Sequence, residues 1–168
     1  AGVIFGASGG VMEAALRTVT DVLTKEDLTN VDYHAVRGEE GVKEASLKIG
    51  DMTVNVAVAH SMVLAKPLLE EIKNGTSKYH FIEIMGCPGG CVNGGGQSYV
   101  NALTRNSGFD WKQARAKALY DEDLALPVRK SHKNSQIQKL YADFLGEPNS
   151  EKAHHLLHTH YTRKERFK

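Results

Sequence analysis

Cysteine, proline and tryptophan are scarce in this sequence, whose 168 residues contain two Cys, four Pro and one Trp. Two cysteines cannot form the disulfide framework of a small secreted domain, and because only three residues separate them, they favour metal ligation or redox chemistry. No apolar run approaches the ~20 residues that a membrane-spanning helix needs, and the N-terminus lacks the basic start and cleavage pattern of a secretory signal. We therefore expect a soluble, cytoplasmic protein that does not enter a membrane.

An excess of charge of one sign is also absent. The 21 Lys and Arg residues face 20 Asp and Glu residues, which leaves a net charge of +1. This balance disfavours nucleic-acid binding driven by bulk charge, and a hydrophobic content of 41% disfavours a disordered chain. The length suits one domain with a small appendage, because it is too short for two domains that each bury a sizeable core.

The first residues form an apolar run, Ala1 to Phe5, with no initiator Met and no polar residues ahead of it. A start of this kind is typical of a segment cut from a longer chain. We therefore expect this sequence to be a fragment, with further parts of the protein lying outside it.

Hydrophobic periodicity predicts strands mixed with helices through residue 105, and helices only after it. The predicted fold class is α/β, with a four- or five-stranded mixed sheet flanked by helices and an all-helical C-terminal extension. Strict alternation places Val54, Val56 and Val58 on one face of their strand. The expected domains are 1–125 and 126–168. Strands are expected at 2–5, 31–36, 47–49, 52–58 and 79–85, and helices at 11–24, 61–73, 97–105, 111–120, 134–145 and 150–161.

Glycines lie between the first predicted strand and the first predicted helix, at Gly6, Gly9 and Gly10. This layout is that of an anion-binding turn, where backbone N–H groups and the helix dipole face a ligand. The stretch matches neither G-x-G-x-x-G nor the Walker pattern, so tight packing of the helix against the strand is the preferred interpretation.

The strongest local signal is Gly86–Gln97, which holds Cys87, Cys91 and six of the 16 glycines. Paired thiolates in bare backbone at the end of a strand can approach an iron-sulfur cluster closely, and free N–H groups can donate to its sulfides. Two alternatives stay open. The cysteines would be buried and free in a turn-rich loop, or they would form a redox dithiol, although the spacing is one residue longer than C-x-x-C.

The number of cysteines limits any cluster that this sequence can hold. A four-iron cluster takes four Cys ligands, and the sequence offers two. Either the other ligands come from a missing segment or another chain, or the site is not a four-iron cluster.

Histidines gather near the C-terminus, where His154 and His158 lie one predicted helical turn apart. A zincin would need Glu at the position of His155, so metalloprotease chemistry is disfavoured and surface or docking histidines are the preferred interpretation. The basic end at 163–168 is interpreted as solvated and frayed rather than as a nucleic-acid patch.

Three stretches, at 5–17, 81–97 and 153–161, resemble the iron-only hydrogenases, whose active site contains a diiron subcluster. They read FGASGGVMEAALR, FIEIMGCPGGCVNGGGQ and AHHLLHTHY, and together they span the sequence from end to end. The second stretch is the most specific. The third is similar to the small-subunit-type C-terminal segment of that family.

The resemblance also implies a site. Cys87 would ligate the [4Fe-4S] cubane of the H-cluster, and Cys91 would bridge this cubane to the diiron subcluster. Met85 would pack beside the carbonyl and cyanide ligands of the irons, and Phe5 and Gly6 would line the same cavity. The implied activity is the reversible formation of H2 from protons and electrons at an open iron position.

The sequence departs from the family pattern in several places. Ser98 stands where Pro is usual, Gly86 where Ala is common and Ser8 where Thr is frequent. The larger departure is that the family's Thr-Ser-Cys-Cys-Pro and Met-Pro-Cys segments, which supply the other cubane ligands, are not in this sequence. We therefore expect the second lobe of the catalytic domain with its C-terminal wrap, inactive and without an H-cluster when alone. Its partners would be the missing N-terminal lobe and an electron carrier such as ferredoxin.

Two other functions stay open. An iron-sulfur protein of the hydrogenase-like cytosolic cluster-assembly family would share the Cys-Pro-x-Gly-Cys loop without H2 chemistry, although the His-Thr-His-Tyr run at 158–161 favours the hydrogenase. A cofactor-free α/β interaction domain would make Cys87 and Cys91 dispensable for the metal content of the protein.

Overall fold

The computed structural model describes residues 1–38 and 41–165. It comprises two compact units, Ala1–Ser131 and His132–Lys168. Residues 166–168 of the predicted basic end lie outside the described part of the chain. Within the described part, no helix has both the length and the apolar character needed to cross a bilayer.

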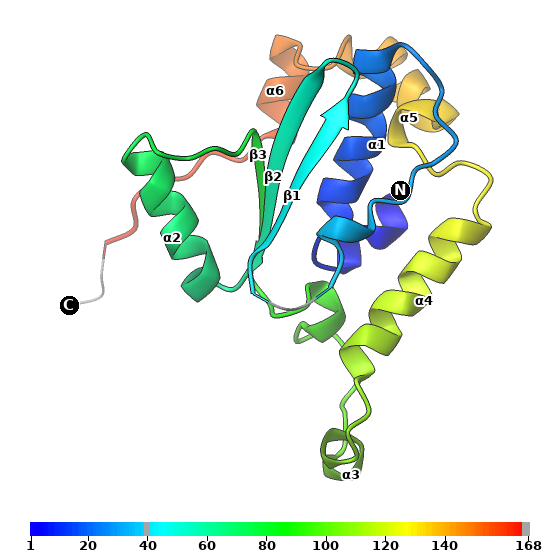
Figure 1. Ribbon diagram of the computed structural model, residues 1–168. Helices are drawn as coiled ribbons and strands as arrows, with labels where there is room; N and C mark the ends of the chain where they lie inside the picture. The colour runs from blue at the N-terminus through cyan, green and yellow to red at the C-terminus, as the bar shows by residue number, and fades with distance from the viewer. Residues whose placement is uncertain (39–40, 166–168) are drawn as a thin grey trace. The chain divides into compact units, whose positions relative to one another are not determined.

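Among the described residues, three strands form a mixed sheet in the first unit, in the order β1-β2-β3 (Figure 1). β1 (Lys43–Ile49) and β2 (Met52–His60) form an antiparallel hairpin that turns at Gly50, where a φ of 58° favours glycine. β3 (Phe81–Met85) lies parallel to β2, and α2 (Met62–Lys73) makes the crossover between them. The predicted α/β class, the mixed sheet and the hairpin are confirmed.

The described sheet has fewer strands than the four or five predicted, because two expected strands lack strand geometry. The run at 2–5 belongs to the 3-10 helix η1 (Gly2–Gly6), and the run at 31–36 ends in η2 (His34–Val36). Ile4 and Val36 are nevertheless fully buried, since each packs against the glycine-rich start of the first helix. A short apolar run indicates burial but not backbone conformation, so periodicity alone could not separate the two structures.

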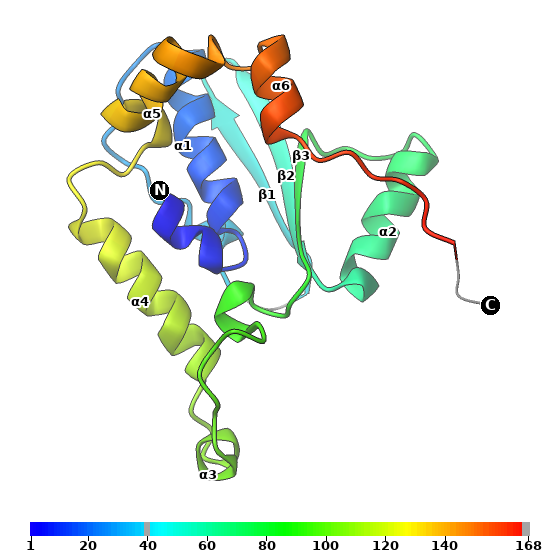
Figure 2. The same ribbon diagram turned by 180° about the vertical axis from the view of Figure 1, so that it is seen from behind.

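The hydrophobic core lies on both faces of β2. Val54, Val56 and Val58 share one face and pack against α1 (Gly10–Thr24), as their alternation predicts. Ala57 and Ala59 occupy the other face, where they pack against α2. α1 and α2 accordingly lie on opposite sides of the sheet, as Figures 1 and 2 show. The members of the first core cluster are Met12, Leu16, Val36, Ile49, Val54, Val56 and Val58.

The other helices of the first unit are α3 (Ala102–Asn106) and α4 (Trp111–Ala125), with the 3-10 turn η3 (Cys91–Asn93) ahead of them. The helix predicted at 11–24 is confirmed as α1. α4 continues past its predicted end at residue 120, because Asp123 near its C-terminus is buried against α1. The helix predicted at 97–105 begins later, where the side chain of Asn101 accepts a hydrogen bond from Thr104 N at 2.8 Å.

The second unit contains α5 (Ser135–Leu140), the π-helical turn η5 (Tyr141–Leu145) and α6 (Glu151–Leu157), after the 3-10 turn η4 (Ser131–Lys133). The predicted helix-starting residues are confirmed, since Asn134 and Ser150 both accept hydrogen bonds from backbone N–H groups in their first turns. The helix predicted at 150–161 ends at Leu157, because the next residue is extended, with a ψ of 139°. The predicted helical extension is therefore present with shorter elements.

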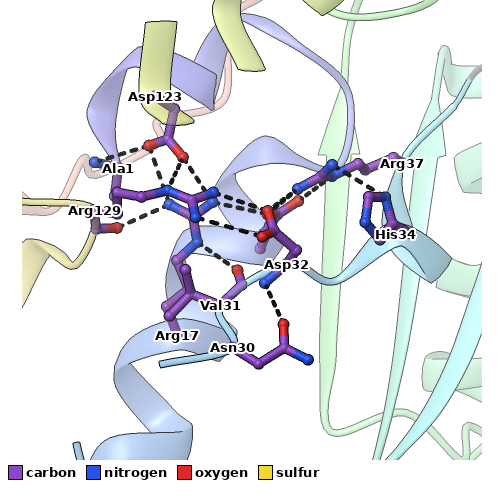
Figure 3. Close-up of polar contacts among 10 residues, drawn as sticks. Ala1, Arg17, Asn30, Val31, Asp32, His34, Arg37, Asp123 and Arg129 are labelled. Atoms are coloured by element: carbon purple, nitrogen blue, oxygen red, sulfur yellow. Dashed lines mark hydrogen bonds and ion pairs between the residues drawn. The ribbon is translucent and has the colours of Figure 1, made fainter. Parts of the chain in front are cut away.

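A group of ion pairs, named here the arginine cluster, lies between α1, α4 and the segment around η2 (Figure 3). Its members are Glu13, Arg17, Asp32, Arg37, Asp123 and Arg129. Arg17 is 1% exposed and donates to both carboxylate oxygens of Asp123, at 3.1 and 2.9 Å. Burial alone would raise the pKa of Asp123, but the guanidinium groups of Arg17 and Arg129 outweigh it and lower that pKa. The cluster thus keeps its buried charges paired.

Because the arginine cluster contains an acid with a lowered pKa, we expect the free energy of unfolding to decrease in acid. Hydrogen bonds from Arg129 and Arg37 lower the pKa of Asp32 from 3.8 to about 2. An acid whose pKa falls on folding stabilises the fold above its unfolded pKa and loses that contribution as the pH falls through its folded pKa. We expect the free energy of unfolding, measured with urea, to fall from pH 4 to pH 2, and Asp32→Asn to make this fall shallower. An equal pH dependence in both proteins would contradict the assignment.

Candidate functional site

The cysteine-bearing loop, residues 86–97, begins where β3 ends at Met85. Cys87 is partly buried, Cys91 is exposed, and both are free thiols. Two short turns hold the cysteine backbones, since Gly90 N donates to Cys87 O and Gly94 N donates to Cys91 O, both at 2.9 Å. The structure therefore presents two free thiols from one loop, at the end of a strand as the sequence predicts.

The loop packs tightly against the segment that follows Phe5. Ser8 N donates to Gly89 O at 3.0 Å, and a Cβ on Gly90 would lie 2.7 Å from the carbonyl oxygen of Gly6. Gly90 also has a φ of 97°, which side chains of L-residues rarely adopt. The structure thus brings Gly6 against the cysteine-bearing loop, although the two are far apart in the sequence.

The other proposed site residues lie at the edges of this arrangement. Met85 is partly buried and its carbonyl oxygen accepts a hydrogen bond from Ser61 N at 2.7 Å, which fixes the end of β3 to the start of α2. Phe5 is 43% exposed, which is high for a large apolar ring. Phe5 therefore leaves much of its apolar surface exposed on this chain.

Several glycines of the cysteine-bearing loop have open space beside them. A Cβ on Gly94 would lie 3.9 Å from Cys87 Sγ and 3.2 Å from Cys91 O, whereas a Cβ on Gly86, Gly95 or Gly96 would meet nothing within 4 Å. Bare backbone beside two soft thiolate ligands suits an iron-sulfur cluster, which bonds to sulfur and needs close approach. Among the described residues, no group of three or more His, Cys, Asp or Glu side chains is placed to hold a metal ion. The chemistry of the two thiols fits two of the four Cys ligands that a four-iron cluster takes.

Backbone N–H groups at the glycine turn before α1 bind the side-chain carboxyl group of Glu83. Gly9 N and Met12 N donate to the two carboxylate oxygens of Glu83, each at 2.7 Å. Burial raises the pKa of Glu83, and these two N–H groups oppose that rise. A Cβ on Gly9 would lie 1.9 Å from the carbonyl oxygen of Val36, so the glycines here serve close backbone packing, the interpretation that the sequence favours. The sequence analysis did not select Glu83 as a functional residue, although an acidic residue inside the apolar strand at 81–85 indicates a buried carboxylate with a specific partner.

Residues of α4 contact both the cysteine-bearing loop and Gly6. Arg115 donates to Val92 O at 2.9 Å and to Ser98 O at 2.7 Å, so it holds the backbone directly after Cys91. The Leu119 side chain lies 2.7 Å from the position of a Cβ on Gly6. Sequence reasoning missed both residues, because α4 shows no motif and its role depends on contacts with distant parts of the chain.

A cavity of about 670 Å³ lies beside the cysteine-bearing loop and reaches α4. Ser8 and Tyr120 contribute buried hydroxyl oxygens that have no hydrogen-bond partner among the described residues. Burial raises the pKa of Tyr120, which keeps its hydroxyl protonated. Gly89 is the part of the loop that lines the cavity, and the two cysteines are not in its lining. The lining residues are Ala7, Ser8, Arg37, Gly38, Lys43, Gly89, Asp110, Gln113, Ala116, Lys117, Tyr120 and Asp121.

Replacing Gly90 with alanine is expected to separate the loop from the segment at Gly6. The new Cβ would stand 2.7 Å from two backbone atoms, Gly6 O and Ser8 N, in a φ that alanine disfavours, so we expect a loss of about 3 kcal/mol in the free energy of unfolding. Urea unfolding of the chain measures it. Gly95→Ala is the control, since it adds the same methyl group in open space and should change stability by less than about 1 kcal/mol. Equal stability of the two variants would refute the packing argument.

Two family models match this chain in succession. Residues 1–95 match the iron only hydrogenase large subunit, C-terminal domain, and residues 110–164 match the iron hydrogenase small subunit. The chain belongs to the iron-only hydrogenase family. The solved structures agree, because [FeFe]-hydrogenase HydA1 from Chlamydomonas reinhardtii, in a variant form, superposes with a TM-score of 0.68 and 36% identity, over 94% of this chain and 45% of that chain.

Similar family members are much longer than this chain. The NADP-reducing hydrogenase subunit HndD of Solidesulfovibrio fructosivorans is 46% identical over 164 residues, which are 98% of this chain and 27% of that protein. The periplasmic [Fe] hydrogenase large subunit of Nitratidesulfovibrio vulgaris is 51% identical over 94 residues, or 56% of this chain and 22% of that protein. A less similar protein, cytosolic iron-sulfur assembly component 3 of Rattus norvegicus, is 30% identical over 158 residues, or 93% of this chain and 31% of that protein.

Proposed function

We propose that this chain is the second lobe of the catalytic domain of an iron-only hydrogenase, residues 1–125, with a small-subunit-like tail, residues 126–168. The observation that carries the proposal is the pair of free thiols on one glycine-rich loop, in a chain that matches hydrogenases along most of its length. The parent protein would catalyse the reversible reduction of two protons to H2. In the parent, the H-cluster would supply the iron position at which hydrogen is formed or split and the cubane that passes electrons.

The residues of this chain would hold and enclose that cluster. Cys87 would provide one cubane ligand, and Cys91 would bridge the cubane and the diiron subcluster. Met85 and the Phe5-Gly6 segment would line the diiron pocket and limit the access of water to it. Support comes from the close packing of Gly90 on Gly6, which places this segment against the loop that carries both thiols.

The chain alone would be inactive, because two thiols satisfy half of the ligand positions of a four-iron cluster. The other ligands would come from an N-terminal lobe, and electrons would arrive from a carrier such as ferredoxin. We also propose a cytoplasmic location for the parent protein. Adding iron, sulfide and a synthetic diiron precursor to the purified chain should give no H2 with reduced methyl viologen. Turnover under these conditions would refute the proposed division of ligands.

A second candidate function is iron-sulfur cluster assembly without H2 chemistry. The observation that favours it is the 30% identity with cytosolic iron-sulfur assembly component 3 of Rattus norvegicus, which extends over 93% of this chain. Higher identity to a hydrogenase subunit, 46% over 98% of this chain, makes the hydrogenase the first candidate.

Infrared spectroscopy of the full-length protein separates the two candidates. A hydrogenase, after maturation, should show bands of iron-bound carbon monoxide and cyanide and should evolve H2 from reduced methyl viologen. A cluster-assembly protein should show iron-sulfur absorption but neither those bands nor H2 evolution. The second result would overturn the hydrogenase proposal.

A further inference from the structure

Glu83 joins the two segments that form the candidate site. Its carboxylate oxygens accept hydrogen bonds from Gly9 N and Met12 N, both at 2.7 Å, and its own strand, β3, leads into the cysteine-bearing loop. Glu83 is 6% exposed, so both contacts are shielded from solvent. We propose that Glu83 is a positioning residue, whose carboxylate sets the distance between the Phe5-Gly6 segment and the cysteine-bearing loop. The inference rests on one part of the proposed function, namely that this loop holds an iron-sulfur cluster.

The start of α1 depends on Glu83 because it has no capping side chain of its own. Gly9 is the residue directly before the helix, and a glycine has no side-chain oxygen that could accept from the first-turn N–H groups. In a capping box, one side chain accepts from the third helical N–H group and another accepts from the N–H group ahead of the helix. Glu83 makes both bonds, to Met12 N and Gly9 N, from a strand that lies 71 and 74 residues further along the chain. The position of this turn is therefore tied to β3.

The sheet directs the carboxylate toward α1. Lys43, Val58 and Glu83 are register partners across β1, β2 and β3, and the side chains of such partners share one face. Val58 belongs to the core cluster that packs against α1, so Glu83 lies on the same face. Burial raises the pKa of Glu83, while the two N–H groups and the positive charge of Lys43 oppose that rise. Both oxygens accept a hydrogen bond, which fits the ionised carboxylate.

The contacts of Glu83 extend to the site on both sides. On the helix side, Gly9 follows Ser8, whose N–H group donates to Gly89 O in the cysteine-bearing loop at 3.0 Å. On the strand side, Cys87 follows Glu83 by four residues, so their Cα atoms lie within about 14 Å of each other. A change at the carboxylate should therefore displace both segments of the site relative to each other.

Glu83→Gln in the full-length protein tests this positioning role. Glutamine has one acceptor oxygen and an NH2 group that donates, so one of the two N–H groups at the start of α1 loses its partner. We expect the infrared bands of iron-bound carbon monoxide and cyanide to shift, and H2 evolution to fall about tenfold to a hundredfold. Bands and activity equal to those of the parent protein would overturn the role.

Two more variants separate position from charge. Glu83→Asp keeps the charge but is shorter by one methylene group, so we expect shifted infrared bands with a cubane reduction potential close to that of the parent. Glu83→Gln removes a negative charge and should raise that potential. Glu44→Gln is the matched control, because Glu44 is exposed on β1 and pairs with Lys78 and Tyr79 at the surface, so bands, activity and potential should not change. Infrared bands in Glu83→Asp that match the parent would show that Glu83 acts through charge, and would overturn the positioning role.

The outcomes also separate this inference from the hydrogenase proposal. Bands that are present in the parent and unshifted in both Glu83 variants would overturn the positioning role alone. A parent with a cubane but without these bands would overturn the hydrogenase proposal, and the electron paramagnetic resonance signal of the cubane would then test Glu83, with altered g values expected and an unchanged signal overturning its role. A parent without any iron-sulfur signal would overturn both. If circular dichroism shows that Glu83→Gln does not fold, Glu83→Asp provides the same measurements.

Discussion

Replacing Cys91 with serine in the full-length protein is expected to lower H2 evolution at least about a thousandfold, because a serine hydroxyl stays protonated near neutral pH and is a poor iron ligand. If Cys91 bridges two parts of the cluster, its loss should remove the infrared bands of carbon monoxide and cyanide while part of the cubane signal in electron paramagnetic resonance remains. Iron content per chain, the infrared spectrum and H2 evolution are the three measurements. Intact infrared bands in Cys91→Ser would contradict the bridging role.

Cys87→Ser is expected to give a contrasting result. If Cys87 ligates only the cubane, as proposed, its replacement should remove the cubane signal together with H2 evolution. Ser98→Ala is the control directly after this loop, since Ser98 is exposed and the alanine keeps the backbone carbonyl that accepts a hydrogen bond from Arg115. Iron content that stays unchanged when both cysteines are replaced would support the cofactor-free alternative and overturn the site.

The α/β class was predictable because several elements carry their own local signals. Alternation at 52–58 fixed the face of Val54, Val56 and Val58, and turn residues at Gly50 fixed the hairpin. The expected strands at 2–5 and 31–36 failed because their burial comes from packing on the start of α1, where Gly9 and Gly10 admit neighbouring carbonyl groups. Such contacts depend on tertiary structure, and a local pattern does not record them.

The same limit separates the predicted and the missed parts of the site. Cys87 and Cys91 could be proposed from the sequence because thiols among glycines are a local feature. Glu83 was missed because its partner N–H groups, such as Met12 N at a sequence separation of 71, lie far away in the sequence. Arg115 was missed for the same reason, since it binds Val92 O at a separation of 23. The supporting contacts of a site are therefore its least predictable part.

Arg17→Met is expected to have the largest effect on the stability of the chain itself. The side chain has 0% exposure, as does that of Asp123, and its removal leaves two buried carboxylates, Glu13 and Asp123, with one fewer cation each. Removing one member of a buried ion group costs about 3–5 kcal/mol, which is a large part of the stability of a domain this size. Urea unfolding at neutral pH measures the free energy of unfolding.

Two further variants distinguish the loss of a buried ion pair from any general effect of introducing methionine into a helix. Lys66→Met makes the same kind of change in α2, where the pair with Glu70 spans 3.8 Å and is mostly exposed, so it should cost less than about 0.5 kcal/mol. The double variant Arg17→Met, Asp123→Leu removes one of the two stranded carboxylates as well as the cation, and should be more stable than Arg17→Met alone, because Arg129 keeps Asp32 as a partner and Glu13 keeps Arg37. Two results would show that the arginine cluster does not stabilise the fold through paired charge. One is that Arg17→Met lowers the free energy of unfolding no more than Lys66→Met does. The other is that the losses caused by Arg17→Met and Asp123→Leu simply add in the double variant.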